Sequence, residues 1–505
     1  MFLFNRRILS AKNQASVLTV LLVFTLTFLC IALVEDARAV DERIADKDIS
    51  DAIQYHLIVD PNIPGNELDV QTIEGVVTLS GSVSNLLAKN RTLEIARTIK
   101  GVRAVVDHIS VEPMVRTDKA LREDVVRAFL SDPATEAYEI DVSVEEGVVT
   151  LTGEVASWQE KELCTKVVRS VEGVREIENK IEFVVESERP DVEIKEEIAR
   201  HLDSDIWVDE QSIEVNVENG KVELSGHVGS VAERARAYTN AWVTGVHSVD
   251  ASTLSIDWTA ADQILRKDTL VTKSDTEIKN AVRDAFLYDP RVTAFKPEIE
   301  VEDGTVTLTG RVGDLKAKQA AEKDARNTVG VWRVRNLLKV RPESPFPDEK
   351  IVKNIQEAIA REPILKKRKL DVSVYDGHVH INGTVNSDFE KRHAKSVVAG
   401  VRGVVDVRNN LIVPETRVWK SDWEIKQDIK SELFWNPFVA SENITVEVSD
   451  GIATLTGTVD SWNEYRLATK EAYKGNAKKV ANRLAVKRGP EELRPKDLET
   501  LPVEK

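Results

Sequence analysis

The residues most able to carry out chemistry in this chain are few, and they do not converge on one site. His378 and His380 stand two apart in a strand-like segment and so share one face, but no third or fourth ligand of a zinc site accompanies them. Cys30 and Cys164 have no histidine partner in a nucleophile motif, and G-x-S-x-G is absent. The glycine-bearing turns lack the lysine of a phosphate-binding loop. We therefore expect no catalytic residue, no metal site and no cofactor.

A surface for binding is the better candidate. Trp435 and Phe438 follow Lys426 and Lys430 at the end of a helix-like segment, and aromatic residues beside basic ones are typical of contact with a membrane surface. Tyr288 holds the position of Trp435 in an earlier, similar segment. We keep these five residues as possible membrane or partner contacts. The alternative for Trp435 is packing against the preceding domain.

One strand-like segment that occurs six times organises these candidates. In residues 147–155 it reads GVVTLTGEV, and its first glycine recurs at positions 75, 147, 220, 304, 377 and 451. The spacing is 72–74 residues, except for one step of 84. Self-similarity at a fixed period is the mark of an array of one small domain.

The second copy shows how each unit is built. Apolar residues recur at helical spacing along LREDVVRAFL (residues 121–130), and Asp132-Pro133 ends the predicted helix. The residue just before this stop differs among the five copies that have one, which indicates an exposed position. A strand at 140–144 then enters the turn Glu146-Gly147, and Asn-Gly or Asp-Gly in other copies favours a type I′ hairpin.

A second helix follows the hairpin in each copy. Its predicted N-cap is always of a capping type: Asn85, Ser157, Ser230, Asp314, Ser387 and Ser461. Four copies add a glutamate for a capping box: Glu160, Glu233, Glu390 and Glu464. A glycine at 101, 173, 245, 330, 403 or 475 is placed for a C′ cap, and a strand such as 174–181 closes the unit. We expect Trp158 and Trp462, just after two of the caps, to be core or capping contacts.

The predicted fold class is α+β: a tandem array of six small αββαβ domains, each a three-stranded mixed sheet with two helices on one face. We place repeat 1 at 46–113, repeat 2 at 117–185, repeat 3 at 190–257, repeat 4 at 273–341, repeat 5 at 347–414 and repeat 6 at 420–488. Residues 258–272 form a linker between two triplets, where we expect any hinge. The charged tail 489–505 is predicted to be disordered.

The N-terminus carries an export signal of one of two kinds. Basic residues at 6, 7 and 12 precede an uncharged apolar run at 15–34 and then Ala37-Arg38-Ala39. This order fits a signal peptide cleaved after Ala39, although the run is also long enough to be an uncleaved inner-membrane helix. Either reading places residues from about 40 onward in the periplasm of a two-membrane bacterium.

The charge balance limits the partners. With 85 acidic and 69 basic residues the chain has a formal net charge of −16 and a pI near 5.2. Such a chain lacks the basic footprint that neutralises phosphates along nucleic acid, so no nucleic-acid partner is expected.

The αββαβ order, the D/N-G-x-V-x-L-x-G-x-V segment and the G-V-x-x-V-x-N-x-L ending together resemble the BON domain (bacterial OsmY and nodulation domain). This resemblance implies a non-enzymatic envelope protein that associates with phospholipid surfaces and supports envelope integrity under osmotic or membrane stress. The alternative is a scaffold or spacer that binds envelope proteins. Exposed aromatic and basic residues on the first helices would favour lipid, and an apolar open sheet face would favour protein.

Overall fold

The computed structural model describes residues 44–60, 62–135, 138–183, 189–257, 273–342, 346–414, 420–488 and 491–492. The apolar run at 15–34 and the linker 258–272 lie outside these residues. In the described part of the chain, no helix is long and apolar enough to cross a membrane.

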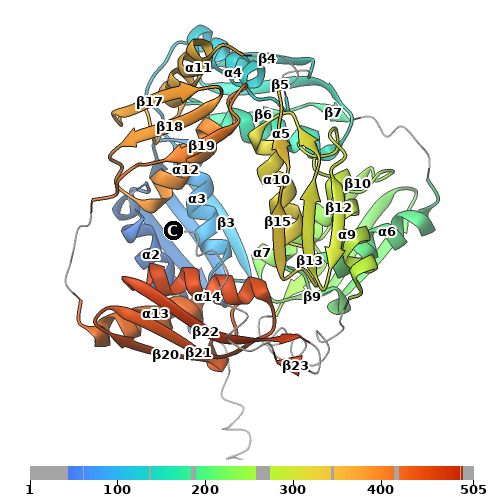
Figure 1. Ribbon diagram of the computed structural model, residues 1–505, viewed down its shortest axis with the longest axis vertical. Coiled ribbons are helices and arrows are strands. Elements are labelled where there is room, and N and C mark those ends of the chain that lie inside the picture. Colours follow the sequence, from blue (N-terminus) through green and yellow to red (C-terminus); the bar gives the residue numbers. More distant parts are fainter. Residues whose placement is uncertain are drawn as a thin grey trace, which may run out of the picture. The chain divides into compact units, whose positions relative to one another are not determined.

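Repeat 2 shows the architecture of one unit (Figure 1). Helix α4 (Asp118–Ser131) leads to a hairpin of β4 (Ile140–Glu145) and β5 (Val148–Val155), which pair antiparallel. Helix α5 (Trp158–Arg169) then returns the chain so that β6 (Glu176–Asn179) and β7 (Glu182–Phe183) pair parallel with β5. The sheet is mixed, as predicted.

Both helices cover the same face of that sheet. Val149 and Leu151 on β5 are fully buried, in one apolar cluster with Leu121 and Val125 of α4 and Val168 of α5. Val148, Thr150 and Thr152 alternate with them and keep solvent contact. The αββαβ prediction is confirmed.

The other repeats follow the same order. Repeat 1 has α2 (Asp46–Val59), β1 (Leu68–Ile73), β2 (Val76–Val83), α3 (Leu86–Arg97) and β3 (Ala104–Val111). Repeat 3 has α6 (Asp191–Ser204), β8 (Ile213–Glu218), β9 (Lys221–Val228), α7 (Val231–Asn240), β10 (Ser248–Asp250) and β11 (Leu254–Ile256). Repeat 4 has α9 (Asp275–Leu287), β12 (Glu298–Glu302), β13 (Thr305–Thr309), β14 (Arg311–Val312), α10 (Leu315–Arg326), β15 (Arg333–Asn336) and β16 (Lys339–Val340).

The last two repeats complete the array. Repeat 5 has α11 (Asp348–Arg361), β17 (Leu370–Tyr375), β18 (His378–Gly383), α12 (Asp388–Ala399) and β19 (Asp406–Asn409). Repeat 6 has α13 (Asp422–Trp435), β20 (Ile444–Ser449), β21 (Ile452–Val459), α14 (Trp462–Lys474), β22 (Lys479–Arg488) and β23 (Glu491–Glu492). Strand β23 pairs with Lys487 and Arg488, so the prediction of disorder is wrong for these two tail residues.

The hairpin turns have the predicted backbone conformation and an unpredicted clamp. Both turn residues have positive φ in all six repeats, for example 48° at Glu146 and 78° at Gly147. Their N–H groups donate to the two carboxylate oxygens of Asp118, the first residue of α4, at 3.0 and 3.1 Å. The same two bonds recur in every repeat, from Asp46, Asp118, Asp191, Asp275, Asp348 and Asp422. We call this carboxylate the turn clamp.

All six predicted N-caps of the second helices are confirmed, because each side chain accepts a hydrogen bond from a first-turn N–H. The predicted capping boxes are wrong. The glutamate accepts instead from the residue before the cap, as Glu160 does from Ala156 N–H at 2.7 Å. True capping boxes occur on two first helices, from Ser274 with Glu277 and from Ser421 with Glu424.

Two other local predictions need correction. The predicted C′ glycines stand several residues beyond most helix ends: α5 ends at Arg169, and Gly173 (φ 98°) closes the following turn. In repeat 6, Gly475 is the C-cap at φ −71° and Asn476 takes the left-handed conformation. The closing strand of repeat 2 is interrupted after Asn179, whose amide donates to Lys161 C=O while its oxygen accepts from Ile181 N–H.

Backbone hydrogen bonds also join repeats in a regular pattern. The donor is the N–H of the residue before the glycine that follows a second helix (Gly101, Gly173 or Gly330). The acceptor is the carbonyl of the last residue of a first helix in another repeat. The pairs are Lys100 to Trp435 (3.0 Å), Glu172 to Arg361 (2.8 Å) and Val329 to Ser204 (2.9 Å). Repeat 1 therefore contacts repeat 6, repeat 2 contacts repeat 5, and repeat 3 contacts repeat 4.

Candidate functional site

Three of the five residues predicted for membrane or partner contact lie against other repeats. The Trp435 carbonyl accepts from Lys100 of repeat 1, so the contact seen here is with the first repeat rather than the preceding one. The Phe438 ring meets Trp207 of repeat 3 edge-on at 4.9 Å. The Tyr288 hydroxyl donates to Glu197 Oε1 of repeat 3 at 2.6 Å, and its ring lies 4.8 Å from that of His201.

The position before the helix stop is therefore mostly not a free surface. Of its six residues only Val59 is exposed, at 53%, and the other five are partly covered. The expectation of an exposed position is wrong for those five. Residue type varies at those five positions because each of these helices ends against a different repeat.

The two predicted lysines do share a surface with aromatic rings, on the outer side of α13. Trp423 is 69% exposed and Phe434 is 41% exposed. At 100° per residue, Trp423, Lys426, Lys430 and Phe434 fall within about 80° of one another around the helix. Ile425, Ile429 and Leu433, centred about 100° around the helix from that group, are buried in the core of repeat 6. We call Trp423, Lys430 and Phe434, which are exposed, together with the partly exposed Lys426, the α13 face.

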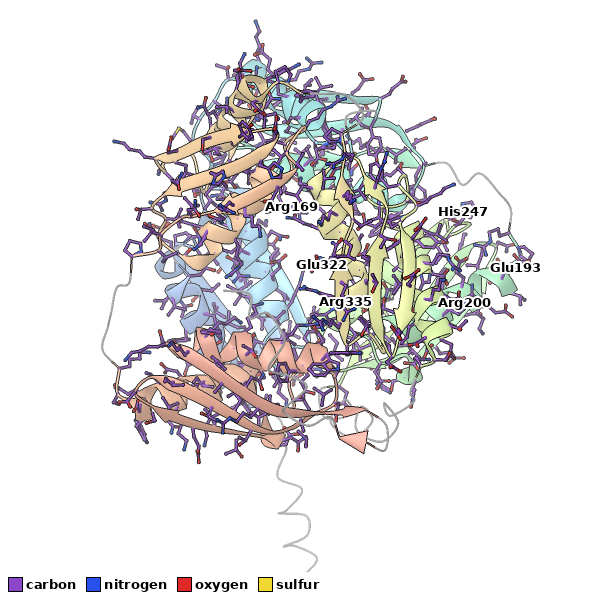
Figure 2. All side chains as sticks on the ribbon, in the orientation of Figure 1. Arg169, Glu193, Arg200, His247, Glu322 and Arg335 are labelled. Carbon is purple, nitrogen blue, oxygen red and sulfur yellow. The ribbon has the colours of Figure 1, made fainter. Side chains whose placement is uncertain are left out.

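Exposed apolar side chains recur near the end of the other first helices. Counting from the turn-clamp aspartate, the thirteenth helix residue is Ile58, Leu130, Leu287 or Phe434 in four repeats, exposed by 53, 61, 59 and 41%. Elsewhere the outer helix surface is ordinary: Figure 2 shows Glu193 and Arg200 of α6 as exposed charged side chains. Counting from that aspartate would have found these residues in the sequence.

The open sheet faces are polar at their centres. The outward residues of the organising strand are partly or fully exposed in every repeat: Thr78, Thr150, Glu223, Thr307, His380 and Thr454. His378 and His380 stand on this face of β18, as predicted. Exposed apolar residues of these sheets lie near the hairpin ends, such as Ile73 and Tyr375.

The inner side of α13 carries buried ionisable groups. Glu432 is 9% exposed, and burial raises its pKa to about 7, helped by Glu471 of α14. His56 Nδ1 of repeat 1 lies 3.9 Å from Glu432 Oε1, but burial lowers the pKa of His56 to about 4. The imidazole is therefore neutral at pH 7, and this contact is not a salt bridge.

Cys164 is fully buried, and burial raises its pKa to about 12. A buried thiol with so high a pKa is a poor nucleophile, because the thiolate is the reactive form. Among the described residues, no group of three or more His, Cys, Asp and Glu side chains is arranged to hold a metal ion.

Comparison with known proteins gives several matches. The osmotically-inducible protein Y of Escherichia coli (strain K12) is 27% identical over 141 residues, which is 26% of this chain and 70% of that protein. CdsD, a structural protein of the type III secretion system of Chlamydia trachomatis, is 15% identical and covers 44% of this chain and 98% of its own, with a TM-score of 0.11. A TM-score this low carries no conclusion.

The family comparison covers most of the chain. The BON domain matches residues 45–113, 117–184, 190–255, 274–342, 347–415 and 421–488. Each match contains one αββαβ unit with its turn clamp and its capped second helix. The chain therefore belongs to the BON domain family.

Proposed function

We propose that this chain is a non-enzymatic, exported protein that associates with the phospholipid surface of the cell envelope and supports envelope integrity under osmotic or membrane stress. The observation that carries the proposal is the α13 face, where two exposed aromatic rings lie on one side of a helix with two lysines. Exposed aromatic rings beside lysines contribute to binding at the membrane interface through apolar area and attraction to anionic headgroups.

The repeated apolar residues on four first helices support the same function. A single exposed aliphatic side chain contributes only about 1–2 kcal/mol when it leaves water. Several weak contacts on one chain gain affinity because later contacts become intramolecular. The polar centres of the sheets argue against the alternative, a protein scaffold that binds through its open sheet faces.

The link to stress and location comes from the relative and from the N-terminus. The matched relative is named for induction by osmotic conditions. The basic, apolar and small-residue segments before residue 40 favour export to the periplasm, either by a signal peptide cleaved near Ala39 or with an uncleaved anchor. The net charge of −16 confines contact with anionic lipid to small surfaces such as the α13 face.

Vesicle co-sedimentation tests the proposal. We expect the protein to bind vesicles of phosphatidylcholine and phosphatidylglycerol at low salt, and Trp423→Ser with Phe434→Ser to weaken binding about ten-fold or more. Tyr375→Ser is the matched control, because Tyr375 is 76% exposed on the hairpin end of β17. Absence of binding at low salt would sink the proposal, and loss of binding only in the Tyr375 variant would point to the sheet instead.

A further inference from the structure

A cavity of about 370 Å³ lies where repeats 2, 3 and 4 meet. Its wall includes the indole rings of Trp158 and Trp242, which stack at 5.2 Å with an interplanar angle of 1°. Trp158 is thus an inter-repeat contact rather than the core or capping residue that its position predicts. Ligand sites typically have volumes of about 300–1,000 Å³ and combine an apolar wall with a few polar groups. This cavity has both features.

Two polar groups of the cavity wall have no partner within the described part of the chain. Trp242 is only 7% exposed, yet its Nε1–H makes no hydrogen bond. His201 Nε2 is also buried and unpaired. Buried polar groups are nearly always satisfied in folded proteins, and an unpaired one costs about 1–3 kcal/mol. Two such atoms beside one cavity leave hydrogen-bonding groups that a ligand could satisfy.

The charges around the cavity select the kind of ligand. Lys166 of α5 and Lys323 of α10 line the cavity. Among the described residues, neither ammonium group makes an ion pair or a hydrogen bond. Arg236 and Arg291 are instead paired, with Asp205 and Asp289 respectively.

The electrostatic surroundings of the two lysines agree with an unfilled anion site. Burial, followed by the neighbouring Arg291, lowers the pKa of both Lys166 and Lys323. Both lysines are nevertheless exposed over more than a third of their surface, so a ligand can reach them. Burial and the carboxylate of Asp289 raise the pKa of Asp324, which favours its protonated, hydrogen-bond-donating form. Glu162 also lines the cavity, so with Asp324 protonated one positive charge remains in excess.

We propose that this cavity binds a small soluble phosphate monoester. The phosphate lies between Lys166 and Lys323 and accepts from the Trp242 indole N–H, and the apolar part of the ligand lies against the Trp158–Trp242 stack. A phosphate monoester carries nearly two negative charges and three acceptor oxygens at pH 7, which suits two free ammonium groups and an unpaired N–H. The site is independent of the proposed membrane contact, because it shares no residue with the α13 face.

Calorimetric titration of the purified protein with phenyl phosphate tests the proposal, without membranes. We expect saturable binding that phenol does not reproduce. The double variant Lys166→Met with Lys323→Met should weaken binding at least about ten-fold, since bonds to charged groups are the strong ones. The matched control is Lys119→Met with Lys279→Met, which removes two lysines outside the cavity from the same repeats. Trp242→Phe keeps the stack and removes the N–H, so it should weaken binding by a smaller factor.

Each arm of the experiment can overturn the proposal. No saturable binding of phenyl phosphate, equal binding of phenol, or equal losses in the cavity and control variants would do so. Vesicles containing phosphatidic acid present the same phosphate monoester from a membrane. Cavity-dependent binding of these vesicles without binding of phenyl phosphate would refute a soluble ligand. Because the α13 variants are not used, failure here leaves the membrane proposal standing.

Discussion

The turn clamp gives the sharpest test of the fold, through Asp118→Ala in repeat 2. Removing the carboxylate leaves the N–H groups of Glu146 and Gly147 without their acceptor. Glu146 also holds a left-handed conformation at φ 48°, which a residue with a side chain adopts only when its surroundings enforce it. We therefore expect the hairpin end to open more often while the core of repeat 2 stays folded.

The size of the effect follows from the exposure of the two bonds. A hydrogen bond to a charged group contributes about 1.5–3 kcal/mol. The bond from Glu146 is exposed and water replaces it easily, whereas the bond from Gly147 is partly buried. Counting mainly the second bond gives about 2 kcal/mol. This corresponds to an about thirty-fold larger population of the open turn, and to the same increase in exchange when closing is faster than exchange.

Hydrogen–deuterium exchange of a peptide spanning residues 145–149 measures this opening directly. A local method is preferable because an array of repeats need not unfold in one two-state step. Asp118→Asn keeps one acceptor and should give an intermediate rate. Asp141→Ala removes an exposed aspartate from β4 of the same repeat and should leave the rate unchanged. Equal exchange in Asp118→Ala and Asp141→Ala would refute the reasoning.

Three further predictions concern a close backbone contact and two buried side chains. A Cβ at Gly457 would lie 2.0 Å from the Asn443 carbonyl oxygen, whereas a Cβ at Gly310 would have no neighbour nearer than 3.9 Å. In urea unfolding, Gly457→Ala should therefore destabilise its repeat by about 2 kcal/mol more than Gly310→Ala does. Glu432 binds a proton more tightly in the folded protein, so its contribution to the free energy of unfolding falls as pH rises from about 4.5 to 7. Glu432→Gln should therefore stabilise the protein by about 1–2 kcal/mol at pH 8 and by less at pH 5. Equal stabilisation at the two pH values would contradict this prediction. In a Cys30→Ser background, Cys164 should react with a thiol reagent only after unfolding, which a colorimetric assay before and after urea addition would show.

Structural features that depend only on residues within one repeat are predicted well from the sequence. The turn residues and the N-caps act on neighbours a few residues away, so their types and spacing are sufficient. The capping boxes fail because Glu160 has a second N–H within reach, that of Ala156, and residue spacing does not distinguish the two. The turn clamp acts over a constant spacing of 28 residues in all six repeats, so comparing the repeats position by position would have found it.

Contacts between repeats could not be predicted in this way. Trp435, Phe438 and Tyr288 differ from the residues at the same positions of the other repeats. Variation among repeats that share a core predicts that such positions are exposed. The structure gives another cause. Repeats 1 and 6, 2 and 5, and 3 and 4 meet through equivalent backbone groups, but the side chains around each contact must suit a different partner.

Variation between copies therefore has two structural causes, and the exposed fraction of the varying side chain distinguishes them. Where a varying residue is partly covered, as at Tyr288, it adapts one repeat to another or lines the cavity between repeats. Where it is exposed, the core of the repeat does not require an apolar side chain, yet Ile58, Leu130, Leu287 and Phe434 are all apolar. The Phe434 ring also lies 5.7 Å from Lys100 Nζ of repeat 1, but the three aliphatic residues cannot make such a cation–π contact. Four apolar residues at one exposed helical position are hard to explain by stability, because none of them adds to a core. They are best explained by a surface outside the protein, which is why the α13 face, and not the repeated strand, is the place to test function.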